Sequence, residues 1–289
     1  MGVAAAPRVL AANPDQEADA AGATAAAVRQ EKFAMNDDLS VSAGGTPADR
    51  AERLTRSMRD QSFPNLKPRD SATLILVDPS GDVPKVLLGR RHERHRFLPG
   101  KFVFPGGRIE PADRLIAAAA ALHEQHARKL MQRVRRPSLA KAAAFALAAV
   151  RETYEETGIM LGVPAAATFR VSPGPWEAFA RAGIAPDLSA VHFIARAITP
   201  PRRPLRFDSR FFTADVSAIA RREDGFVGPD KELVELVWLP ITQARQLDMP
   251  GITAVVLEEL QDRIAASMSH EHPVPLYRML HKHFVREIL

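Results

Sequence analysis

Cysteine is absent from the 289-residue chain, which excludes disulfide bonds, thiolate catalysis and zinc or iron–sulfur centres held by cysteine. No apolar run approaches the roughly 18 to 20 residues that cross a bilayer, so we predict no membrane-spanning helix and no membrane partner. Aromatic residues make up 6% of the chain, and no basic surface interleaved with aromatics stands out. This composition disfavours nucleic acid as a partner.

Positive charge is in modest excess, +5 from 39 Lys and Arg against 34 Asp and Glu. Arginines concentrate at residues 90–96, 133–136 and 202–210. A guanidinium group holds phosphate through two parallel N–H donors, so these clusters suit an anionic small molecule. Solvated surface charge is an equally good interpretation of each cluster taken alone.

Residues 1–68 differ in composition from the rest of the chain. Alanine-rich stretches alternate with Asp, Gln, Gly and Pro, so we predict a largely disordered N-terminal extension, with a short helix at 50–60. No continuous apolar segment supports a secretory signal, and we expect a cytoplasmic protein. Met35 is an alternative start, which would leave residues 1–34 outside the protein.

Residues 69–289 are predicted to form one α/β domain. The turn signal at residues 78–82 predicts a hairpin between its first two strands. Strands interleaved with helices favour an α/β/α sandwich around a mixed sheet. The predicted strands are 72–77, 86–88, 102–104, 191–197, 206–214 and 233–238, and the predicted helices are 114–135, 139–157, 241–247, 252–267 and 276–288.

The helix at 139–157 carries the strongest chemical signal. Ser138 is a good N-cap, and Gly158 stands where a C-terminal glycine belongs. Glu152, Glu155 and Glu156 lie within about one turn at the negative end of the helix dipole, which destabilises each by roughly 0.3–1 kcal/mol. A hard divalent cation would relieve this repulsion, whereas an acidic, solvated helix end is the simpler structural interpretation.

A glycine turn precedes this helix. Phe104, Pro105, Gly106 and Gly107 end a strand, and the two glycines permit close approach of other groups to the backbone. A tight turn without function is one interpretation. Placed before an acidic helix, the turn could hold the helix against the sheet and present amide groups to an anion.

The turn and the helix together resemble the Nudix hydrolase family. Its box runs Gly, five residues, Glu, seven residues, then Arg-Glu-apolar-any-Glu-Glu-any-Gly-apolar. The residues that match in spacing and identity are Gly107, Arg151, Glu152, Glu155, Glu156, Gly158 and Ile159. Thr153 replaces an apolar residue. The resemblance implies a Nudix α/β/α sandwich and a hydrolase acting on phosphorus anhydrides.

The box is interrupted in this chain. Asp113 stands where the family has its first glutamate, and its role is open between that of the family residue and a cap of the following segment. The arginine stands at 151 where the family spacing from Gly107 gives position 121, so thirty residues are inserted. We predict a helical insertion at 114–137, as in the interrupted-box subset of the family.

The resemblance also implies roles for individual residues. Glu152, Glu155 and Glu156 would bind Mg²⁺ or Mn²⁺, which activates water for attack on phosphorus. Arg151 would orient these carboxylates and, with Glu152, belong to the catalytic machinery. A general base from a later loop would be Glu232 or Glu235, and the sequence does not choose between them.

A second resemblance concerns the substrate. The coenzyme A pyrophosphatases of this family share a spacing of residues that includes Arg91, Arg96, Gly106 and Gly107 here, with Gly89 and His92 as departures. The implied reaction is hydrolysis of coenzyme A or acyl-coenzyme A to 3′,5′-ADP and (acyl)phosphopantetheine. The four matching residues would then bind substrate.

Arg206 and Arg210 are candidates for a second phosphate clamp. The simpler interpretation is a strand in which Phe207 and Phe211 share one face and the two arginines share the other.

Other substrates and roles remain open at this point. ADP-ribose, NADH and capped RNA are alternatives within the enzyme class, and a non-catalytic RNA-binding Nudix module is the alternative outside it. Acidic residues at all three metal-ligand positions favour the enzyme. The oligomeric state is open, with a homodimer as one option. The histidines lack a metal-ligand spacing that would indicate zinc, and His123 and His126 are interpreted as surface or packing residues.

Overall fold

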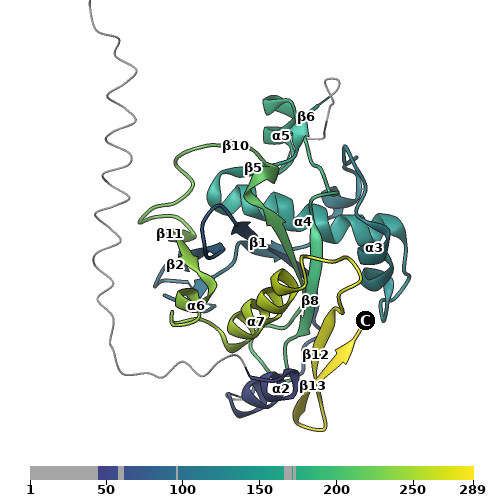
Figure 1. Cartoon of the computed structure of the whole chain (residues 1–289), viewed down its shortest axis with the longest axis vertical. Helices are drawn as coiled ribbons and strands as arrows, with labels where there is room; N and C mark the ends of the chain where they lie inside the picture. Colours follow the sequence, from purple (N-terminus) through teal and green to yellow (C-terminus); the bar gives the residue numbers. More distant parts are fainter. Residues whose placement is uncertain (1–44, 58–61, 96, 166–170, 172–173) are drawn as a thin grey trace, which may run out of the picture. The chain divides into compact units, whose positions relative to one another are not determined.

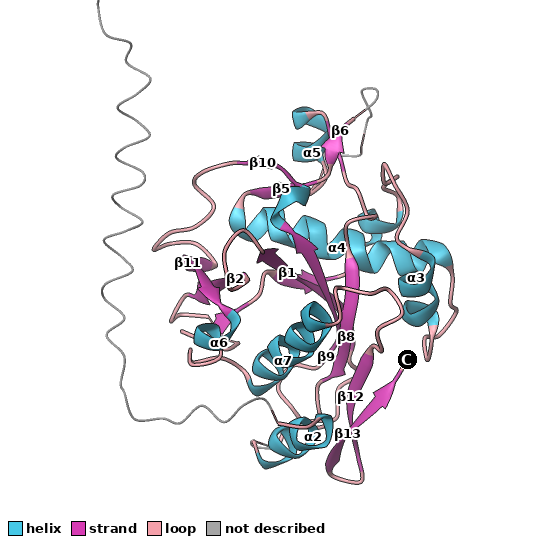
Figure 2. Cartoon of the chain, in the orientation of Figure 1, coloured by secondary structure: helices cyan, strands magenta, loops and turns pink. Residues whose placement is uncertain are grey.

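A mixed β-sheet forms the centre of the domain (Figures 1 and 2). Its main path follows the order β11 (Leu233–Pro240), β2 (Lys85–Arg91), β1 (Arg69–Asp78), β9 (Phe207–Asp215), β8 (His192–Ile198), β12 (Pro275–Leu280) and β13 (His283–Ile288). The pairs β1–β9 and β8–β12 are parallel, and the other neighbours on this path are antiparallel. The short strands β3 (Phe102–Val103) and β4 (Gly106–Arg108) pair with β2 and β1, respectively.

The computed structural model describes residues 45–57, 62–95, 97–165, 171 and 174–289. The chain divides into two units, Met1–Ala43 and Gly44–Leu289, and every described residue belongs to the second. The predicted disorder of residues 1–44 therefore lies outside the described residues. No described helix is long and apolar enough to cross a membrane.

Helices cover both faces of the sheet, as predicted. Alternate residues of β1 face opposite sides, with Leu74 and Leu76 in the core beneath α4 (Leu139–Thr157). Ile75 and Val77 pack in the second core with α7 (Gly251–Ala265). Because both faces of its central strands are buried, the domain is an α/β/α sandwich.

The predicted helix that carries the acidic residues is confirmed at both ends. The Ser138 side chain accepts a hydrogen bond from the Lys141 N–H at 3.1 Å. Gly158 closes α4 in the left-handed conformation, with φ of 74°. The six predicted strands and the hairpin between β1 and β2 are also present. The remaining elements are α5 (Glu177–Ala182), α6 (Ile241–Ala244), and the strand pairs β5 (Ile159–Leu161) with β10 (Ile219–Arg222) and β6 (Val163–Pro164) with β7 (Ile184–Ala185).

The insertion is less helical than predicted. Only α3 (Glu124–Met131) is an α-helix, preceded by a 3-10 turn at Pro111–Arg114. Between the 3-10 turn and α3 the backbone forms hydrogen bonds with a segment further along the chain. The Ala119 N–H, for example, donates to the Pro186 carbonyl at 2.8 Å. Residues 115–123 cannot make these bonds and those of a helix at once. The prediction of a helix over 114–135 is therefore wrong except at residues 124–131.

The prediction of a C-terminal helix at 276–288 is wrong. This segment forms the hairpin of β12 and β13, so helix does not extend through 250–289. His281 and Lys282 connect the strands with φ of 47° and 68°, the conformation of a two-residue type I′ turn. Such turns favour Asn-Gly or Asp-Gly, and the His-Lys pair gives no comparable signal.

Part of the predicted N-terminal extension packs onto the domain as α2 (Pro47–Arg56), close to the helix predicted at 50–60. Thr46 and Asp49 form a capping box at its start. The buried Arg50 lies 3.1 Å from Glu258 and 2.8 Å from Glu259 of α7. Because this helix buries a charge against the domain, folded structure begins well before residue 69.

Candidate active site

The glycine turn meets the acidic helix at the edge of the sheet. Gly106 and Gly107 pair with Thr73 and Ala72 of β1. A Cβ atom on Gly107 would lie 2.5 Å from the Glu152 carboxylate. The Gly106 N–H donates to Glu156 Oε2 at 3.2 Å. A Cβ atom on Gly106 would lie 2.6 Å from the Ala72 carbonyl oxygen, so close approaches explain why both positions hold glycine.

Arg151 organises the carboxylates around it. Its Nη1 lies 2.8 Å from Glu152 Oε1 and 2.7 Å from Glu155 Oε2. Its Nη2 donates to the Arg108 carbonyl at 2.8 Å, which ties α4 to β4. Since Arg151 is 1% exposed, its guanidinium is fixed in orientation. Arg151 is thus placed to hold both glutamates in position.

Asp113 is the buried partner of Arg151. Arg151 Nε donates to Asp113 Oδ1 at 2.8 Å, and Trp176 Nε1 donates to the same oxygen at 3.0 Å. The Glu110 N–H also donates to Asp113 Oδ2, which caps the 3-10 turn. Asp113 therefore completes the capping box of the 3-10 turn, while its family role stays a prediction. Trp176 was missed from the sequence because no spacing relates it to the box.

The carboxylates disfavour one another's ionised forms. Burial raises the pKa of Glu152 to about 7, and the charges of Glu155 and Glu232 act in the same direction. Burial also raises the pKa of Glu156 well above its ordinary value, reinforced by Glu232 and Glu152. A pair of ionised carboxylates in such a place needs positive charge nearby.

The two candidates for the general base lie in different environments. Glu232 lines the same cavity as Glu152 and Glu156, and its Oε1 lies 3.0 Å from Nη2 of Arg91. Glu235 instead pairs with Arg90 at 3.0 Å, and it does not line the cavity. A bulge between Leu233 and Glu235 shifts the pairing of β11 with β2 between the two glutamates.

The arginines predicted to bind substrate also differ in whether they line the cavity. Arg91 lines the cavity beside Gly106 and Gly107. Arg96 lies outside the described residues. Neither Arg206 nor Arg210 lines the cavity, so the cavity gives no support to a role of these two residues in substrate binding.

The alternation of side chains along β9 explains why Arg206 and Arg210 lie outside the cavity. Arg206 Nη1 donates to Asn65 Oδ1 at 2.8 Å. Arg210 is buried over the Phe145 ring of α4, 4.0 Å from its centroid, with Asp70 as an ionic partner. Phe207 and Phe211 face the cavity, as the alternative interpretation required. Arg203, from the same arginine-rich segment, lines the cavity instead.

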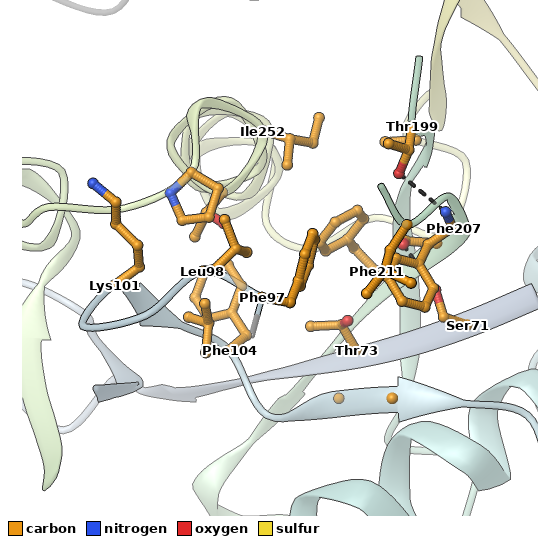
Figure 3. A pocket seen from close by; sticks show the side chains of 18 of the residues that line it. Ser71, Thr73, Phe97, Leu98, Lys101, Phe104, Thr199, Phe207, Phe211 and Ile252 are labelled. Carbon is orange, nitrogen blue, oxygen red and sulfur yellow. Dashed lines mark hydrogen bonds between the residues drawn. The ribbon is translucent and has the colours of Figure 1, made fainter. Parts of the chain in front are cut away.

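The cavity has a volume of about 870 Å³ and two chemically different ends. One end holds the carboxylates, Arg91 and the glycine turn. The other is apolar, and Figure 3 shows Phe97 beside Phe207, with ring centroids 5.7 Å apart. The residues that complete this end include Leu54 of α2, Phe211 of β9, Ile252 of α7 and Phe284 of β13. None of these was singled out from the sequence as part of a site.

The donor set suits a divalent cation that prefers oxygen. Glu152, Glu155, Glu156 and Glu232 all line the cavity and offer only carboxylate oxygens. Burial raises the pKa values of Glu152, Glu155 and Glu156, neighbouring carboxylates add to the effect, and a bound dication would offset it. The residues present therefore fit Mg²⁺ or Mn²⁺.

Similarity to solved structures agrees with this fold. No family model matches the chain, and no curated protein matches it. A Nudix hydrolase from Alicyclobacillus acidocaldarius is 27% identical, with a TM-score of 0.52 over 66% of this chain and 90% of that chain. The fold is that of the Nudix hydrolases, and the likeness supports a hydrolase that acts on pyrophosphate bonds.

Two further Nudix structures are similar at lower scores. A MutT protein from Methanosarcina mazei Go1 is 16% identical over 69% of this chain and 98% of that chain, with a TM-score of 0.39. The Nudix domain of NrtR from Shewanella oneidensis, solved with ADP ribose, is 14% identical over 74% of this chain and 97% of that chain, with a TM-score of 0.37.

Proposed function

We propose that the protein is a divalent-metal-dependent pyrophosphatase that cleaves coenzyme A or acyl-coenzyme A. The products would be 3′,5′-ADP and (acyl)phosphopantetheine. The observation that carries the proposal is the continuity of one cavity from the carboxylate cluster to an aromatic and aliphatic end. A substrate with a diphosphate and a long, less polar arm matches both ends.

The polar end supports chemistry at phosphorus. Bound Mg²⁺ or Mn²⁺ would supply positive charge to the diphosphate oxygens and favour ionisation of water. Arg151 holds Glu152 and Glu155 in fixed orientations. Glu232 is the residue we propose as proton acceptor from the attacking water, since Glu235 lies outside the cavity. Arg91 would stabilise charge on the phosphoryl oxygens.

The apolar end supports the choice among diphosphates. Phe97, Phe207 and Ile252 form a surface that offers little to a second ribose or to a nicotinamide carboxamide. Burying apolar surface contributes about 25 cal/mol per Å², so a pantetheine or acyl chain would gain affinity there. The volume also lies within the range of about 300–1,000 Å³ that is typical of small-molecule sites.

A turnover panel tests the proposal. Coenzyme A, acyl-coenzyme A, ADP-ribose, NADH and capped RNA are each incubated with the full chain and Mg²⁺ or Mn²⁺, and products are identified by mass spectrometry. We expect the highest kcat/KM for a coenzyme A species. A clear preference for ADP-ribose, NADH or capped RNA would reject the substrate but retain the enzyme class.

A matched pair of variants separates the two ends of the cavity. Phe207→Ala should raise KM for acyl-coenzyme A more than for ADP-ribose, because it removes apolar surface only. Thr213→Val on the same strand is the control, since Thr213 does not line the cavity. RNA binding without metal-dependent hydrolysis of any panel member would support the non-catalytic alternative.

A further inference from the structure

Three histidines from distant parts of the chain converge outside the catalytic cavity. His126 belongs to α3, His192 begins β8, and His270 follows α7. His126 Nε2 lies 3.4 Å from His192 Nδ1 and 3.0 Å from His270 Nδ1. All three nitrogens lie within 4.8 Å of one another, and none of the residues lines the catalytic cavity.

The ring orientations direct these nitrogens at one another. The rings of His192 and His270 are parallel, with an interplanar angle of 5° and centroids 4.6 Å apart. The His126 ring stands nearly edge-on to both, at 62° and 66°. His126 Nε2 therefore faces the two Nδ1 atoms together.

Three neutral imidazole rings cannot satisfy all of their facing nitrogen atoms by hydrogen bonding to one another. Each neutral imidazole has one donor and one acceptor nitrogen. His126 Nε2 can donate to one neighbour or accept from one with its single lone pair, so three facing nitrogens cannot all be well paired. His126 is fully buried, and its Nδ1 has no hydrogen-bond partner.

We propose that His126, His192 and His270 form a structural site for a transition-metal ion, best fitted by Zn²⁺. Tetrahedral zinc with Zn–N bonds of about 2.0–2.1 Å separates its ligand nitrogens by about 3.3 Å. The observed 3.0 and 3.4 Å bracket that value. His192 and His270 are only half-buried, so solvent could provide a fourth ligand.

The surrounding charge selects against hard cations. Lys129 donates to the His270 carbonyl and Arg263 to the His272 carbonyl, so two positive charges lie beside the histidines. Only metals that bind imidazole strongly would overcome this repulsion, which favours the later first-row ions over Mg²⁺ and Ca²⁺. The site is thus chemically distinct from the carboxylate cluster.

The metal would fasten the insertion to the rest of the domain. Lys129 Nζ of α3 already donates to the carbonyls of His270 and His272, at 3.1 and 2.9 Å. The ligands come from the insertion, the sheet and the loop after α7, so no local spacing in the sequence marks them. This is why the interpretation of His126 as an ordinary surface or packing residue missed the group.

The test is Zn²⁺ and Co²⁺ binding to the full chain after metal removal by chelation. The variants His192→Gln and His270→Gln replace the half-buried ligands, and exposed His283→Gln is the matched control. Glu156→Gln removes a carboxylate of the catalytic cluster and reports any zinc bound there. Circular dichroism and gel filtration check that each variant folds.

We expect one tight Zn²⁺ per chain in the wild type, His283→Gln and Glu156→Gln, and at least about a 10-fold loss of affinity in the two ligand variants. Co²⁺ should give the intense visible absorption of a tetrahedral site, lost in the same two variants. Zn²⁺ at 100-fold excess over its Kd should raise Tm by about 5 °C or more. Unchanged affinity and Co²⁺ spectrum in His270→Gln, or no tight Zn²⁺ in the wild type, would overturn the proposal.

Discussion

Arg151 and Asp113 form a buried ion pair across the insertion, with Arg151 Nε 2.8 Å from Asp113 Oδ1, although the two residues are 38 positions apart in the chain. Asp113→Ala would remove an ionic partner of the Arg151 guanidinium, which is almost completely buried. Removing one member of a buried pair typically costs about 3–5 kcal/mol. We expect a loss of this size in the free energy of unfolding, measured with urea.

An exposed ion pair provides the comparison. Arg56 and Glu52 pair on the surface of α2, with more than half of each side chain exposed. Glu52→Gln should change the free energy of unfolding by at most about 0.5 kcal/mol. Similar losses in the two variants would contradict the structural role of Asp113.

Glu156→Gln should lower kcat by at least about 10²-fold while the protein stays folded. The substitution keeps the side-chain size and the contact with Gly106 but removes a charge that would face the metal. Steady-state kinetics at saturating Mg²⁺ measures the effect. Near-normal turnover would contradict the assignment of the acidic cluster as the metal site.

Glu232→Gln and Glu235→Gln distinguish the two candidates for the general base. Glu232 lines the cavity, so its substitution should lower kcat by about 10²-fold or more. Glu235 is held by Arg90 outside the cavity, so its substitution should change kcat less than about threefold. The reverse ranking would transfer the proposed role to Glu235.

Without divalent cations the protein should lose stability as pH rises. The pKa of Glu152 is raised from 4.5 to about 7, so the native state binds more protons than the unfolded chain between these values. The free energy of unfolding therefore falls as pH increases through this window, by about 2–3 kcal/mol. Denaturant titrations at pH 5 and 7.5 measure this. Glu152→Gln should reduce the slope, and a slope of opposite sign would contradict it.

Arg91→Ala and Arg210→Met should act on different properties. Arg91 lines the cavity, and loss of a charge-assisted hydrogen bond of about 1.5–3 kcal/mol corresponds to an increase of about 10- to 100-fold in KM. Arg210 is buried against Phe145, so its substitution should alter thermal stability and leave kcat/KM within about twofold. A large KM effect at Arg210 would place it in the substrate site after all.

Local signals made much of the domain predictable. Alternating or continuous apolar runs identified the main strands, and Ser138 and Gly158 marked both ends of α4. The carboxylates of this helix follow from its 3.6-residue period, because spacing along a helix fixes which side chains are neighbours. The acidic cluster was thus accessible from the sequence.

Features that depend on long-range contacts were not predictable in the same way. Trp176 reaches Asp113 and Leu54 reaches the cavity only once the chain is folded. The direction of Arg210 depends on which face of β9 meets α4, and a strand period alone gives two faces without saying which is the site. The hairpin of β12 and β13 was missed because its turn uses His281 and Lys282 in left-handed conformations.

The Arg151–Asp113 contact also bears on how such a domain can gain sequence during evolution. Asp113 stands just before the insertion and Arg151 lies in the second half of α4, the helix that follows it, so the pair joins the two sides of the inserted segment. Lengthening a loop adds little entropy cost, about 0.6 kcal/mol for each doubling. A segment placed here can grow, shrink or acquire its own ligand while the catalytic residues keep their positions. Selection can therefore act on the insertion independently of the reaction.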